Sequence, residues 1–186
     1  MARLRVEGLP AVSRELERIR KAQAPAIAAA VEAATSFGHK LAVDEVYRRY
    51  GFRERAYVEQ HLTVSFNPRT LEGRVIGRYR PSSLSRFIVR ENTRTSKLGG
   101  KVVRDGVTIA SIRNQPNWLK GAFTYIGRNG NRLVAERSKG DNSWRSLKGR
   151  KTLYGPSVAG SFAVIRSQIE PPIIQHLRDR YRQLAK

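Results

Sequence analysis

The central part of the chain alternates apolar and polar residues with a period of two, which is typical of β-strands. Within 119–137, Phe123 and Tyr125 share one face of a predicted strand, and a second strand of the same pattern follows. Asn129 and Gly130 lie between the two strands, and these residue types tolerate the positive φ of a tight turn. The segment therefore predicts a β-hairpin.

Two further strand pairs are predicted before this hairpin. Alternation over 58–66 predicts one strand, and 73–79 reads as its partner. A second pair is predicted around Asp105 and Gly106, because an Asp-Gly dipeptide suits a type I′ turn. The polar segment 91–100 ends in glycines and has no period, so we expect a loop there.

The amino-terminal part spaces its apolar residues as an amphipathic helix does. They recur at intervals of three or four from Val12 to Leu41, and the middle of this stretch is rich in alanine. Pro25 interrupts the pattern, and it either kinks one long helix or separates two helices. We expect the helical part to end near residue 50, with Gly51 as its C-terminal cap.

The carboxyl-terminal part also predicts helices. A short strand should stop before Ser157, which suits the N-cap region of a helix whose apolar face runs over 158–169. Pro171 and Pro172 should break that helix, because proline lacks the N–H that the helix needs. A final amphipathic helix is predicted over 173–184.

The order of these elements predicts an α+β fold in a single domain, 1–186. N-terminal helices should occupy about 9–51, and C-terminal helices about 156–185. Between them, about 57–155 should form a central antiparallel β-sheet of hairpins with long basic loops.

The balance of charge limits the classes of partner. The chain has 36 Lys and Arg against 15 Asp and Glu, a formal net charge of +21, and this excess favours nucleic acid or acidic protein surfaces. No stretch reaches the roughly 18 apolar residues of a membrane span, and we expect neither a membrane role nor a secretory signal. The absence of cysteine excludes disulfides and thiolate metal sites.

Two basic segments are candidate interfaces. The predicted loop 137–151 has six basic residues against one acidic residue, with one tryptophan, a pattern that suits phosphate contacts and a stacking ring. Because no base-reading motif is present, acidic faces of partner proteins are favoured over nucleic acid, and a merely solvated loop is the third alternative. The candidate residues are Lys139, Trp144, Arg145, Lys148, Arg150 and Lys151 in this loop, and Arg90, Arg94, Lys97 and Lys101 in a second patch.

Catalytic and metal-binding patterns are weak. The three histidines are far apart in the sequence, and no GxSxG or GxxxxGK[ST] motif occurs. Asp44 and Glu45 are the one adjacent pair of carboxylates, and neighbours on a helix do not face each other. We therefore expect no enzyme activity, metal or cofactor.

Several short motifs, in this order, resemble those of the minor tail protein Z family of long-tailed bacteriophages, the tail completion proteins of lambda-like phages. Near the amino end, the resemblance includes the start of a helix at Gly8-Leu9, the run from Ile19 to Ala22, Pro25 and the alanine-rich stretch after it. Further motifs follow along the chain: Gly121-Ala122-Phe123, the turn at Asn129-Gly130, Arg137, and Gly155-Pro156-Ser157-Val158 followed by Phe162.

The resemblance implies a structural protein of the virion tail, without a catalytic site, that acts in tail completion and head–tail joining at the head-proximal end of the tail. It implies a homo-oligomeric ring, with a hexamer favoured, beside the tail terminator, the head–tail connector or stopper and the tail tube. It also implies assembly in the host cytoplasm. The charge of the basic loops motivates the separate hypothesis that they form one of the ring's interfaces or face the genomic double-stranded DNA. The competing interpretation is a stand-alone basic nucleic-acid-binding protein.

Overall fold

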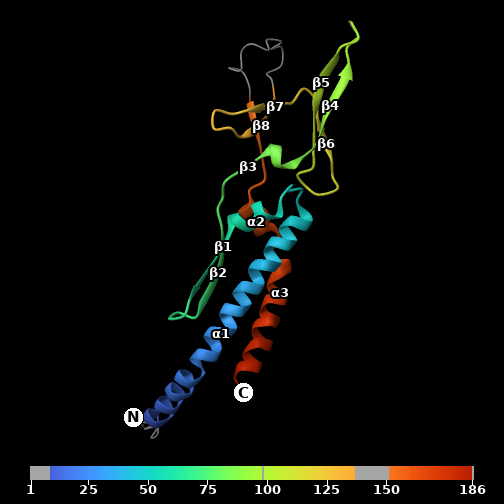
Figure 1. Cartoon of the computed structure of the whole chain (residues 1–186). Coiled ribbons are helices and arrows are strands. Elements are labelled where there is room, and N and C mark those ends of the chain that lie inside the picture. Colours follow the sequence, from blue (N-terminus) through green and yellow to red (C-terminus); the bar gives the residue numbers. More distant parts are fainter. Residues whose placement is uncertain (1–8, 98, 137–150, 186) are drawn as a thin grey trace, which may run out of the picture. The chain divides into compact units, whose positions relative to one another are not determined.

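A computed structural model of the chain describes residues 9–97, 99–136 and 151–185, and it confirms the α+β class (Figure 1). The helices are α1 (Leu9–Arg49), α2 (Arg55–His61) and α3 (Val158–Leu184), with a 3₁₀ helix η1 (Leu84–Phe87). The strands are β1 (Leu62–Asn67), β2 (Glu72–Gly77), β3 (Ser82–Ser83), β4 (Ile88–Thr95), β5 (Val102–Ile109), β6 (Asn117–Leu119), β7 (Phe123–Ile126), β8 (Arg132–Glu136) and β9 (Lys151–Gly155).

Contacts within the chain divide the described residues into two compact units. The first unit combines 9–39, 64–75 and 169–185, and the second combines 40–63 with the described part of 76–168. Each unit is therefore assembled from segments that lie far apart in the sequence.

In the first unit, the amino-terminal part of α1 packs against the carboxyl-terminal part of α3. The ring of Phe37 stacks on the ring of His176 with centroids 4.4 Å apart. The Tyr181 hydroxyl donates a hydrogen bond of 2.8 Å to the Gln23 side chain. Because the partner number in α3 rises as the number in α1 falls, the two helices run antiparallel, side by side (Figure 1).

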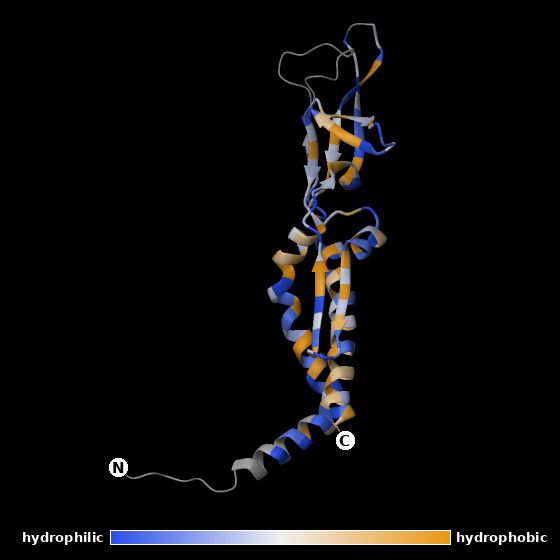
Figure 2. Cartoon of the chain, turned by 90° about the vertical axis from the view of Figure 1, so that its left-hand side faces the viewer, coloured by the Kyte–Doolittle hydropathy of each residue, from blue (hydrophilic) through white to orange (hydrophobic). Residues whose placement is uncertain are grey.

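Small residues make this close packing possible. Ala30 and Ala34 are buried at an interval of four residues, and Gly38 continues the same face of α1. A Cβ atom on Gly38 would lie 2.9 Å from Cδ1 of Ile173, so the helices approach each other at a glycine. Figure 2 shows hydrophobic and hydrophilic residues interleaved along both long helices, as amphipathic packing requires.

In the second unit, the predicted hairpin is confirmed as β7 and β8. Phe123 pairs with Ala135 in antiparallel register, and the Gly127 N–H donates to the carbonyl of Asn131 at 2.8 Å across the turn. These strands belong to a four-stranded sheet of order β3-β9-β8-β7, and a three-stranded sheet has the order β4-β5-β6. The large side chains that are fully buried in this unit are Phe52, Phe87, Leu62, Ile165, Val43, Val46, Val58, Val107, Val134 and Val158.

The prolines of both long helices lie inside them. Pro25 lies inside α1, which agrees with one long helix, whereas the predicted break at Pro171 and Pro172 is wrong because α3 continues through both. The carbonyl groups that lose a helical donor belong to Ser167 and Gln168, which are exposed, so water can hydrogen-bond to them. Packing of the apolar face of α3 outweighs the proline penalty.

The predicted hairpin at Asp105 and Gly106 is also wrong, because both residues lie inside the continuous strand β5. Gly106 has φ +110°, and a Cβ atom there would lie 2.3 Å from the carbonyl oxygen of Leu119. The glycine is needed where β6 approaches β5, not in a turn. The partner of β5 on its other side is β4, so the loop predicted over 91–100 is a strand as far as Thr95.

Two smaller predictions need correction. The strand predicted over 58–66 begins at Leu62, because residues 55–61 form α2 and bury Val58. Gly51 is not a left-handed cap, since its φ is not positive. Instead, a Cβ atom on Gly51 would lie 1.7 Å from the carbonyl oxygen of Ala110, so glycine is required by a close backbone contact.

Candidate basic interface

Most of the predicted basic loop lies outside the described residues. Lys139, Trp144, Arg145, Lys148 and Arg150 all belong to 137–150, so the structure does not place them. Lys151 is the first residue of β9, is exposed, and pairs in register with Glu136 of β8.

The second predicted patch lies on β4 and on its connection to β5, and its four residues are exposed. Arg94, Lys97 and Lys101 lie at the same end of this strand pair, where the Ser96 N–H donates to the carbonyl of Lys101 at 2.7 Å. Arg90 lies four residues earlier in the strand, about 13 Å away at the usual rise per residue. The structure therefore gathers three of the four predicted cations at one end of the pair.

Two ion pairs involve charged residues of β4. The Arg94 guanidinium lies 3.3 Å from the Asp105 carboxylate. Glu91 accepts hydrogen bonds from the Thr124 hydroxyl and the Arg132 guanidinium, which link β4 to β7 and β8. The Thr124 hydrogen bond, and then the Arg132 contact, lower the pKa of the Glu91 carboxyl below its usual value.

A different part of the second unit has a basic groove of about 590 Å³, which we call the arginine groove. Arg53, Arg80, Arg86 and Arg132 line it together with one carboxylate, that of Glu54. Four arginines against one glutamate give the lining a formal charge of +3 with histidine neutral. The remaining lining residues are Tyr57, Gln60, His61, Pro81, Ser83, Ser85, Asn129, Asn131, Leu133 and Tyr154.

Hydrogen bonds hold the walls of the arginine groove together. The hydroxyls of Ser83 and Ser85 both donate to the carbonyl of Arg132, at 3.2 and 2.7 Å, and so join β3 and η1 to β8. The Tyr57 hydroxyl donates to the Ser82 hydroxyl at 3.2 Å, which joins α2 to β3. The groove is therefore built from three parts of the unit that are fixed to one another.

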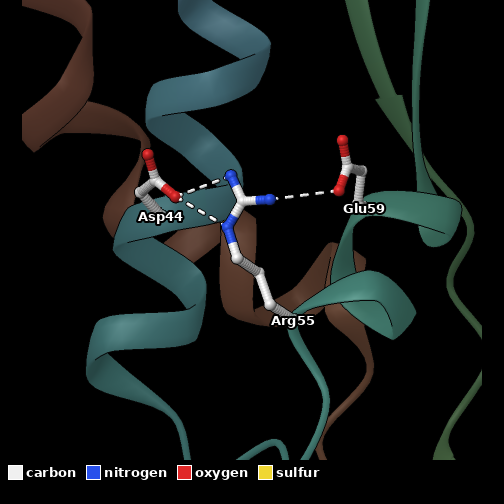
Figure 3. A network of polar contacts seen from close by, with 3 residues as sticks. All are labelled: Asp44, Arg55 and Glu59. Atoms are coloured by element: carbon white, nitrogen blue, oxygen red, sulfur yellow. Dashed lines mark hydrogen bonds and ion pairs between the residues drawn. The ribbon is translucent and has the colours of Figure 1, made fainter.

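An arginine outside the groove connects α2, which supplies one of these walls, to α1. Arg55 contacts the Asp44 carboxylate of α1 at 2.8 Å and the Glu59 carboxylate of its own helix at 3.1 Å (Figure 3). The hydrogen bonds to Asp44 raise the pKa of the Arg55 guanidinium, with smaller contributions from the two negative charges. Arg55 thus links α2, which supplies Tyr57 to the groove, to α1.

The sequence analysis missed all four arginines of the groove. They come from the segment before α2, the segment before β3, η1 and β8, and no two of them are close enough in the sequence to form a basic run. The pairing of β3 with β9, and of β9 with β8, brings three of these segments together. No local signal in the sequence indicates this pairing.

Other kinds of site find no support in the described part of the chain. No group of three or more metal-ligating side chains comes together there. None of the helices described in the structure is both long and apolar enough to cross a membrane. Comparison with models of protein families, with curated proteins and with solved structures finds no match.

Proposed function

We propose that the chain is a structural protein of a bacteriophage virion that acts in tail completion and in head–tail joining, at the head-proximal end of the tail. The observation that carries this proposal is the ordered series of motifs that resembles the minor tail protein Z family. The proposed role requires no catalytic site, metal or cofactor.

Two of those motifs lie at corners of the fold, which supports the proposal. Gly130, in the Asn-Gly pair, has φ +75° in the turn between β7 and β8. Gly155 ends β9, and the Ser157 hydroxyl accepts a hydrogen bond of 3.0 Å from the Gly160 N–H at the start of α3. These are the local structures, a hairpin turn and a strand-to-helix corner, that the resemblance implies for the two motifs.

The proposed partners follow from the proposed position. In this proposal the chain forms a homo-oligomeric ring, with a hexamer favoured, and contacts the tail terminator, the connector or stopper and the tail tube. Head-to-tail interfaces, in which two different patches of each subunit meet, close such rings. Exposed cations such as Arg94, Lys97 and Lys101 provide one patch for a neighbouring subunit or for the double-stranded DNA. The protein would reside in the virion after assembly in the host cytoplasm.

Electron microscopy of particles produced without this protein tests the proposal. We expect filled heads and separate tails of full length, and complementation with the wild-type gene should restore joined particles. Intact, infectious particles without the protein would overturn the proposal. In the complementation experiment, replacement of Arg145, Lys148 and Arg150 by Glu should abolish joining, and normal particles would exclude a role for the predicted loop.

The net charge of +21 favours a second candidate, a stand-alone nucleic-acid-binding protein. Binding through phosphate contacts should weaken steeply between low and moderate salt, because condensed counterions are released on binding. An assembly interface with buried apolar area should keep its affinity over the same range. Measurement of the salt dependence of DNA binding therefore separates the two candidates.

A further inference from the structure

The arginine groove has unused hydrogen-bond donors. Arg53 and Arg80 are exposed, and their side chains make no hydrogen bond or ion pair within the part of the chain that the structure describes. The one carboxylate of the lining, Glu54, lies 4.0 Å from Arg86, at the limit of an ion pair. The lining therefore keeps a positive charge that its own residues do not neutralise.

Arg86 is already held in a geometry that suits an anion. Its guanidinium lies over the Tyr57 ring, 3.6 Å from the ring centroid. Stacking uses the face of the guanidinium and leaves its N–H groups, which point outward in the plane, available for a carboxylate. Because the Tyr57 hydroxyl is itself hydrogen-bonded to Ser82, the Arg86 guanidinium stacked on Tyr57 is held in place before a ligand binds.

Among the described lining residues, a single aromatic ring is largely exposed, that of Tyr154 at 61%, and this favours a carboxylate ligand over a nucleic-acid strand. A strand would need a series of free aromatic faces on which successive bases can stack. Arg86 covers one face of Tyr57, and the rings of His61 and Phe52 pack beside it with centroids 4.1 and 5.9 Å away. By contrast, the side-chain amides of Gln60 and Asn131 in the lining suit the polar main chain of a peptide.

We propose that the arginine groove binds a short carboxylate-rich segment of a partner protein. Arg53 and Arg80 supply the free guanidinium groups, and Arg86 supplies the one fixed by stacking. The volume of about 590 Å³ lies within the range of pockets that enclose a small ligand, so a few residues of the segment fill it. This inference rests on the groove alone and does not depend on the proposed role in tail completion.

Fluorescence anisotropy with two labelled probes tests the inference on the full chain at about 150 mM salt, where general charge attraction is screened beyond about 8 Å. One probe is a six-residue peptide of alternating Glu and Gly, and the other is a six-nucleotide oligothymidine. The test variant is Arg53→Glu with Arg80→Glu. The control variant, Lys120→Glu with Arg178→Glu, changes the net charge equally at exposed residues that neither line the groove nor adjoin a lining residue in the sequence.

We expect the peptide to bind, and the test variant to weaken that binding by about tenfold or more, since it places two repulsive charges in the groove. The control variant should change the affinity by less than about threefold, because its charges lie outside the lining and are screened by salt. Arg53→Gln with Arg80→Gln should give an intermediate loss, and circular dichroism should show the wild-type spectrum for each variant. No peptide binding, equal losses in the test and control variants, or binding of the oligothymidine alone through the groove would overturn the inference.

Discussion

Phe87 is the side chain whose removal should destabilise the second unit most clearly. It lies in η1, is 1% exposed, and its ring centroid is 4.7 Å from that of Phe52. On another side, the backbone of β9 packs directly on the ring, since a Cβ atom on Gly155 would lie 2.4 Å from Cε2 of Phe87. Phe87 therefore connects strand β9, through Gly155, to the segment before α2, through Phe52.

Phe87→Ala should lower the free energy of unfolding by about 4 kcal/mol. Phe-to-Ala substitutions in cores cost about 3–5 kcal/mol, and the cost is greater where neighbours cannot fill the cavity. Here one neighbour is a glycine, which has no side chain to move into the space. For a chain of this length, about 4 kcal/mol corresponds to a fall of roughly 8–16 °C in the melting temperature.

Urea unfolding followed by circular dichroism measures this change. The midpoint should fall while the slope stays constant, because the native fold is retained. Phe87→Leu, which fills most of the space, should cost less than about 2 kcal/mol. Tyr79→Ala is the exposed aromatic control, because Tyr79 is 75% exposed, and it should change stability by less than about 0.5 kcal/mol. A loss for Phe87→Ala no larger than that for Tyr79→Ala would refute the reasoning.

Three further predictions follow from single residues. The partners of Glu91 lower its pKa in the folded chain, so the carboxylate stabilises the fold above its unfolded pKa of about 4.3, and this contribution is lost as pH falls through the folded pKa. Glu91→Gln should therefore destabilise the chain at pH 7 and make little difference in acid, which urea unfolding across this pH range measures. Gly51→Ala should cost about 3 kcal/mol, because its Cβ atom would overlap the carbonyl oxygen of Ala110. Ser161→Ala should raise the free energy of unfolding by up to about 1 kcal/mol, and so raise the melting temperature slightly. The reason is that the buried Ser161 hydroxyl has no hydrogen-bond partner among the described residues.

Matched variants control these predictions. Gly130→Ala strains only a left-handed backbone in open space, so it should cost about 1 kcal/mol, clearly less than the Gly51 substitution. Ser167→Ala changes an exposed serine of the same helix as Ser161 and controls for helix propensity. Equal losses for the two glycines, a destabilised Ser161 variant or a Glu91 effect that persists unchanged in acid would contradict the corresponding argument.

Local signals in the sequence predicted local structure well. Asn129 and Gly130 indicated the turn between β7 and β8, where only a positive φ is required. Ser157 indicated the start of α3, and its hydroxyl accepts a hydrogen bond from a backbone N–H there. In both cases the residues that carry the signal and the contacts that they satisfy lie within five positions of each other.

Glycine and proline misled the prediction where a distant segment decides the conformation. Gly51 and Gly106 are explained by the approach of the backbone at Ala110 and Leu119, which no local pattern shows. The prolines of α3 are tolerated because buried neighbours such as Ile169 hold the helix in place. The same residue type therefore has two interpretations, a local turn or break and a long-range contact, and only the tertiary structure chooses between them.

The candidate site shows the same division. A search for basic runs selects Arg94, Lys97 and Lys101, which are close in sequence and remain close at one end of β4 and β5. It cannot select Arg53 and Arg80, because their common groove depends on the order β3-β9-β8 and on the position of α2. Arginines that are scattered in the sequence but brought together by the fold are therefore the stronger candidates for a specific binding site. A groove with fixed walls limits which anions fit, whereas an exposed basic run attracts anions of any shape.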